Sequence, residues 1–297
     1  MRKDVFSDYH PIVNLLYFMA VIGFAMFFTH PLCLSISLVC AFSYSLYIKG
    51  RKAARFILVF MLPMLVVTAL INPAFNHQGV TILTYLPSGN PLTLESILYG
   101  IAAAAMLITV IAWFSSFNLV ITTDKLVFLF GRLIPALSLV LAMALRLVPR
   151  YRDQLKIITN AQKCIGRSGS DGNLLQKVKH AIRINSILVT WALENAIETA
   201  DSMNGRGYGL PGRTAFSIFH FDKRDALALA YIAACAGTVL IGAATGAYRF
   251  RYFPSVRGEW TSLYTIAVFV AYFALAVFPL IINIKEEMVW KSIASKT

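Results

Sequence analysis

Charged residues are scarce in this chain: aspartate, glutamate, lysine and arginine make up 14 % of its 297 residues, against 58 % hydrophobic residues. Soluble globular domains carry about 25 % charged residues, so this composition excludes that class and indicates a chain that lies largely in lipid. Cysteine is scarce as well. The four cysteines stand apart, without a C-x-x-C pair or a neighbouring histidine, so we expect packed thiols and neither a disulfide framework nor a zinc site.

Carboxylates are missing from the interior of the apolar runs. Proton- and sodium-coupled transporters usually need buried ionisable groups, so this absence argues against an independent secondary transporter. The sequence also lacks an H-E-x-x-H motif and a Ser/His/Asp arrangement, which argues against a membrane enzyme. Its five histidines are scattered, and we expect no bound metal. The secondary transporter, and behind it the membrane enzyme, remain the alternatives.

Apolar runs of nearly membrane-spanning length organise the rest of the chain. About 20 residues are needed to cross the hydrocarbon core. Six runs come close to that length, at residues 12–29, 31–48, 56–71, 96–114, 225–247 and 262–284. The sequence therefore predicts an all-α polytopic membrane protein with about six transmembrane helices and a cytoplasmic coupling domain of long amphipathic helices.

A seventh apolar run, 126–148, is decided by the positive-inside rule. Basic residues precede the first span and join the second to the third, whereas the loop 72–95 has none, so this loop is expected outside. If 126–148 also crossed, the following segment 146–213, with eleven Lys/Arg and five Asp/Glu, would lie outside too. We therefore expect 126–148 to lie along the cytoplasmic interface or buried against other helices, with both termini in the cytoplasm.

This topology divides the chain into three parts. Residues 1–125 hold the first four spans with the outer loop, residues 126–224 hold the interfacial helix and two cytoplasmic helices, and residues 225–297 hold the last two spans and a tail. The formal net charge of +13 does not indicate a nucleic-acid partner, because the basic residues cluster beside apolar runs, where they set membrane topology.

Two helix patterns in the basic segment end in the same dipeptide. The first covers about 150–169 and the second about 174–203, and they end at Gly166-Arg167-Ser168 and Gly205-Arg206-Gly207. Glycine is expected as a helix C-cap, and arginine suits the negative end of the helix dipole. An arginine at a projecting helix end can also form a two-pronged contact with a carboxylate or with carbonyl groups of a partner.

Three carboxylates, Glu194, Glu198 and Asp201, lie in the last turns of the second pattern. Acidic groups near a helix C-terminus oppose the macrodipole, so we expect nearby arginines to offset them. Both intramolecular ion pairing and a direct role in partner binding remain open. The glycine-rich stretch 207–214 resembles a phosphate-binding loop, but it follows a helix instead of a strand and contains Pro211, so we expect no bound ATP.

The stretches ALRLVPRYRDQLKIITNAQKCIGR and ENAIETADSMNGRGYG, together with the apolar framework and Asn72-Pro73 after the third span, resemble the transmembrane T component of energy-coupling factor transporters. That family carries Ala-Arg-Gly at the end of each of two coupling helices. Here glycine replaces the alanine at Gly166 and Gly205, and Ser168 replaces the first glycine, while both arginines are present.

The resemblance implies a scaffold in the plasma membrane of a prokaryote, without catalysis or cofactors of its own. Its partners would be two cytoplasmic ATPase subunits, which hold ATP and magnesium, and a membrane S component that captures a micronutrient, a vitamin or a metal ion. Arg167 and Arg206 would contact the ATPases. ATP-driven movement of the two helices would then rock the capture subunit toward the cytoplasm.

Overall fold

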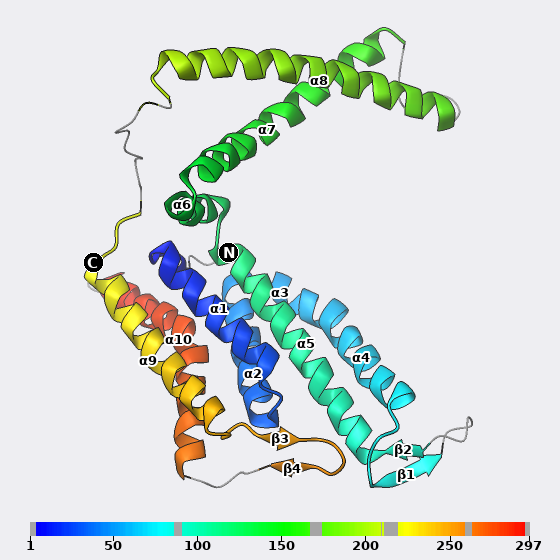
Figure 1. Ribbon diagram of the computed structural model, residues 1–297, viewed down its shortest axis with the longest axis vertical. Coiled ribbons are helices and arrows are strands. Elements are labelled where there is room, and N and C mark those ends of the chain that lie inside the picture. Colours follow the sequence, from blue (N-terminus) through cyan, green and yellow to red (C-terminus); the bar gives the residue numbers. More distant parts are fainter. Residues whose placement is uncertain are drawn as a thin grey trace. The chain divides into compact units, whose positions relative to one another are not determined.

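The computed structural model describes residues 4–85, 91–166, 174–208, 210, 219–258 and 263–294 (Figure 1). The chain forms two compact units. Unit 1 comprises Met1–Lys125 and Phe219–Thr297, and unit 2 comprises Leu126–Ile218. The second predicted part, 126–224, and unit 2 begin at the same residue.

Unit 1 is a helix bundle. Its helical elements are η1 (Val5–Asp8), α1 (Pro11–Phe27), α2 (Pro31–Lys49), α3 (Arg51–Phe56), the π-helical turn η2 (Ile57–Met61), α4 (Leu62–Phe75), α5 (Leu94–Val120), α9 (Lys223–Ala244) and α10 (Leu263–Ala294). Two short antiparallel hairpins join helices, β1 (Ile82–Tyr85) with β2 (Pro91–Thr93), and β3 (Phe250–Arg251) with β4 (Arg257–Gly258). In Figure 1, α5 lies between α1 and α4, and it packs against both.

Six helices of unit 1 match the six predicted spans. Five helical stretches are long and apolar enough to cross a membrane, Pro31–Lys49, Arg51–Phe75, Leu94–Val120, Lys223–Ala244 and Leu263–Ile293, and Pro11–Phe27 is a shorter apolar helix. The second of these includes the turn η2, which joins α3 to α4 without a break. The prediction of an all-α polytopic membrane protein is therefore confirmed.

Aromatic side chains fill the core of the bundle. Trp113 of α5 is fully buried, and its ring lies edge-on to those of Tyr17 and Phe18 of α1, at centroid distances of 6.1 and 6.3 Å. The indole Nε1 of Trp113 donates a hydrogen bond to Ser37 Oγ of α2 at 2.9 Å. A buried indole N–H is costly when it has no hydrogen-bond acceptor, and Ser37 provides one. Trp113 therefore connects α5 with α1 and α2.

The segment before α1 closes one end of the bundle through a buried carboxylate. Asp4 accepts hydrogen bonds from the Tyr44 hydroxyl (2.9 Å) and from Asn283 Nδ2 (2.6 Å), which belong to α2 and α10. Burial raises the pKa of Asp4, because a low-dielectric surrounding penalises the charged form. The hydrogen bonds from Asn283 and Tyr44 oppose that shift.

A buried lysine lies beside this carboxylate at the end of unit 1. The Lys125 ammonium donates to the carbonyl oxygens of Ser7 and of Val120, the latter at 2.9 Å. Burial lowers the pKa of Lys125, while the charge of Asp4 acts in the opposite direction. The two groups tie the start of the chain to the residues that precede unit 2.

Unit 2 is built from α6 (Thr123–Leu133), whose first turn still belongs to unit 1, α7 (Pro135–Cys164) and α8 (Leu174–Gly205). The expectation of one helix over 126–148 is wrong, since this run is divided at Ile134, whose backbone is extended (φ −138°, ψ 90°). Pro135 explains the break, because proline disfavours a helical residue before it and fits the first position of the next helix. α7 then continues through Pro149, so the predicted interfacial and first cytoplasmic helices share one helix.

Candidate functional site

The candidate site consists of the two long helices of unit 2 and their C-terminal ends. The prediction for the second cytoplasmic helix was 174–203, and α8 covers Leu174–Gly205. α7 ends at Cys164, five residues before the predicted limit of 169. Both patterns are therefore long helices, and α7 and α8 cross each other (Figure 1).

Three side chains meet where the two helices cross. The rings of Tyr151 of α7 and Trp191 of α8 lie edge to face, with centroids 5.7 Å apart and an interplanar angle of 79°. The guanidinium carbon of Arg150 lies 5.4 Å from the centroid of the Trp191 ring, within the range of a cation–π contact. Trp191 therefore makes an aromatic and a cationic contact with consecutive residues of α7.

Little else of these helices is buried. Among the described residues of unit 2, Ile158 of α7 is the only buried one, and α8 has none. Four residues of α8 are half-buried at helical spacing on the side of Trp191: Ile184, Leu188, Trp191 and Asn195. The helix pair thus has a narrow apolar seam and leaves most of its surface exposed.

The C-terminus of α8 adopts a Schellman motif around the second signature. The Gly207 amide donates to the Asn204 carbonyl (3.0 Å), and the Tyr208 amide donates to the Met203 carbonyl (3.1 Å). Gly207 has φ +77°, a left-handed conformation that favours glycine. Arg206 is therefore the last residue before the reversal of the chain, and its side chain is exposed.

The end of α7 is arranged differently. The residue with positive φ is Gly166, at +73°, and its amide donates to the Lys163 carbonyl at 3.0 Å. The left-handed glycine thus precedes the arginine in the first signature and follows it in the second. Arg167 and Ser168 lie outside the described residues. Cys164, which we expected to be a packed thiol, is exposed at this end, while Cys33 and Cys40 are buried.

The three acidic residues of α8 are exposed. Glu194, Glu198 and Asp201 form no ion pair with any described residue; the ion pair found among the described residues of unit 2 is Lys156–Asp153 in α7. Their carboxylates are thus open to a partner. The glycine-rich stretch 207–214 follows α8 directly, and most of it lies outside the described residues.

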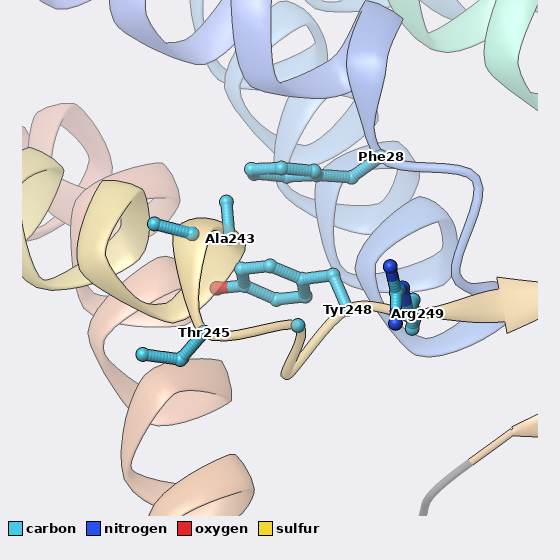
Figure 2. Close-up of a pocket in the computed structure, with 7 residues that line it drawn as sticks. Phe28, Ala243, Thr245, Tyr248 and Arg249 are labelled. Atoms are coloured by element: carbon cyan, nitrogen blue, oxygen red, sulfur yellow. The ribbon is translucent and has the colours of Figure 1, made fainter.

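A pocket of about 320 Å³ lies in unit 1 (Figure 2). The ring of Tyr248 stacks on that of Phe28 at 4.3 Å, and Thr245 and Arg249 complete the labelled polar lining. The Tyr248 hydroxyl donates to the Val268 carbonyl. With one cationic side chain and no carboxylate or histidine among its lining residues, the pocket has no acid–base pair for catalysis.

Sequence reasoning missed one part of the site, the crossing at Trp191. The apolar periodicity of the first helix includes Tyr151, but a single-helix pattern does not say which residue of a second helix it meets. The signal that could have indicated this contact is one aromatic residue near the middle of each helix, Tyr151 and Trp191.

Comparisons with known proteins indicate the family of this chain. A family model described as CbiQ, cobalt transport protein, matches residues 3–216. The energy-coupling factor transporter transmembrane protein EcfT of Lactobacillus helveticus (strain DPC 4571) is 37 % identical over 106 residues, which cover 35 % of this chain and 38 % of that protein. The EcfT protein of Lactococcus lactis subsp. cremoris (strain MG1363) is 38 % identical over 92 residues, covering 31 % and 35 %. The matched segments thus span little more than a third of these relatives.

Proposed function

Because this chain belongs to the CbiQ family, the transmembrane components of energy-coupling factor transporters, we propose that it is the scaffold subunit of an ATP-driven importer. The scaffold couples ATP hydrolysis by two partner ATPase subunits to the movement of a substrate-capture subunit. It carries out no catalysis, and ATP and magnesium bind to the ATPases. It lies in the plasma membrane with both termini in the cytoplasm.

The observation that carries this proposal is the pair of long helices, whose described ends, Gly166 and Gly205-Arg206, are exposed. α8 has 32 residues and none is buried, so packing against its own chain stabilises it little. We therefore expect partner subunits to cover its surface. Arg206, at the reversal after α8, presents a planar cation to a carboxylate or to backbone carbonyls of one ATPase. Arg167 takes the same role at the end of α7.

A second apolar face of α8 supports contact with a membrane-embedded capture subunit. Six exposed apolar residues recur at helical spacing on the side opposite the seam with α7: Leu175, Val178, Ile182, Val189, Leu193 and Ile197. An exposed apolar stripe of this length marks an interaction surface. The capture subunit selects the micronutrient, a vitamin or a metal ion.

Charge reversal tests the docking role directly. The double variant Arg167→Glu/Arg206→Glu is expected to lose copurification of the ATPase subunits in mild detergent while the chain remains in the membrane. The matched control is Lys177→Glu/Lys179→Glu, which makes the same charge change on exposed positions of α8 and is expected to keep the ATPases. Retained binding by the arginine variant would refute the docking role.

A further inference from the structure

The contact between α7 and α8 lies at nearly the same distance from both candidate docking ends. Gly166 stands fifteen residues after Tyr151, and Gly205 stands fourteen residues after Trp191. At about 1.5 Å per residue, each end lies roughly 20 Å along its helix from the crossing. The Tyr151–Trp191 contact is thus the common origin of two arms that differ in length by one residue.

The crossing is also narrow. Beyond the Trp191 cluster, Ile158 is the one buried side chain among the described residues of the two helices, others are half-buried, and most are exposed. Because an extended interface would hold the two helices at one angle through many contacts, a short seam makes the angle depend on the few residues at the crossing. Trp191 has the largest side chain among them.

The chemistry of the cluster suits a contact that persists while the angle changes. An edge-to-face aromatic pair tolerates a range of ring orientations, and a cation–π contact depends mainly on the distance of the cation from the ring face. Arg150 and Tyr151 are consecutive in α7, so they approach Trp191 from one place on that helix. The contact therefore resists separation of the helices more than it resists their rotation.

From this geometry we infer that Trp191, held by Arg150 and Tyr151, is a positioning residue: it is the pivot that sets the spacing between the two ATPase-docking ends. This inference rests on the proposed scaffold function. The two ends then move as a pair when the ATPases close and open, because both arms turn about one contact. Loss of the pivot leaves each end able to bind an ATPase but no longer fixes the spacing between them.

The spacing can be measured in the full chain in detergent. One nitroxide is attached to the native Cys164, which is exposed, and the other to Ser202→Cys, one turn before Arg206, with Cys235→Ser as the background. Trp191→Ala is expected to broaden the distribution of distances between the labels, and Trp191→Phe, which keeps an aromatic ring, is expected to retain the parent distribution. A Trp191→Ala distribution identical to that of the parent would overturn the inference.

The consequence for coupling is measured in the reconstituted complex as substrate uptake per ATP hydrolysed. Trp191→Ala should keep both ATPase subunits and lose about tenfold in this ratio, within the range by which substitutions along a coupling contact change coupling. Trp191→Phe should restore most of it. Parental coupling in Trp191→Ala would contradict the pivot. If the scaffold proposal is wrong, the parent chain will bind no ATPase subunit. The distance measurement does not depend on the ATPases, so it still tests whether Trp191 sets the spacing between the two helix ends.

Discussion

α1 and α8 differ in how their residues are stabilised. α1 has 17 residues, of which nine are buried against other helices of the bundle, whereas α8 has 32 residues and none is buried. In a bilayer, buried side chains stabilise helix contacts through van der Waals packing and interhelical hydrogen bonds, so α1 is held by its own chain. α8 lacks that contribution. The bundle is thus stabilised by packing within the chain, whereas α8 leaves most of its surface exposed.

The largest difference in stability is expected between substitutions of two tryptophans, Trp113 and Trp191. Trp113→Ala removes a fully buried indole from the junction of three helices and should lower the free energy of unfolding of the bundle by about 3–5 kcal/mol. Trp191→Ala should change it by no more than about 0.5 kcal/mol. The measurement is the reaction of the buried thiols Cys33 and Cys40 with a maleimide as the temperature is raised, in a Cys164→Ser/Cys235→Ser background. Equal losses in both variants would show that the helix pair contributes to the stability of the bundle.

A smaller effect is expected at the end of α8, where two glycines serve as a matched pair. Gly207→Ala forces a side chain into φ +77°, with its Cβ 3.1 Å from Leu210 Cδ1, and should destabilise the helix end by about 1–2 kcal/mol. Gly205→Ala meets no atom within 4 Å and should stabilise the helix by about 0.5–1 kcal/mol. Amide hydrogen exchange of the last turn distinguishes them. Equal exchange rates would mean that the Schellman turn does not form.

The buried carboxylate of the bundle should make stability depend on pH. Because the folded-state pKa of Asp4 is raised, its contribution is fully present below the unfolded-state pKa and is lost as pH rises through the folded value. Asp4→Asn removes this titration, so its melting temperature should rise relative to that of the parent between pH 4 and pH 7. Circular dichroism melts in detergent provide the comparison. A difference that does not vary with pH would contradict the assignment.

The smallest effect on stability should come from the exposed stripe of α8. Val189→Ser/Leu193→Ser should leave the melting temperature of the bundle unchanged, because neither residue is buried. The same variant should lower copurification of the capture subunit by at least about tenfold, since it removes apolar area from that contact. Thr190→Ser is the control on the same helix. If the variant copurifies with as much capture subunit as the parent does, the stripe is not part of that interface.

The spans and α8 could be predicted from sequence because their signals are local. Apolar length identifies a membrane helix without knowledge of its neighbours, and the apolar periodicity of α8 gave its first residue and placed its end within two residues. The break at Ile134 was missed although Pro135 marks it, because the continuous apolar character of 126–148 outweighed one proline. Pro149 behaves in the opposite way, because α7 continues through it without a break.

Features that depend on the folded chain could not be predicted. The two Gly-Arg ends look equivalent as letters, yet the left-handed glycine is Gly166 before one arginine and Gly207 after the other. Which glycine reverses the chain depends on where the helical hydrogen bonds end. The Tyr151–Trp191 contact likewise depends on how two helices meet.

The most direct test of the scaffold account is the subunit composition of the intact complex, measured by native mass spectrometry after gentle detergent extraction of the full chain. The account predicts one copy of this chain with two ATPase subunits and one small membrane protein. A chain that is extracted alone and transports substrate without ATP would contradict it.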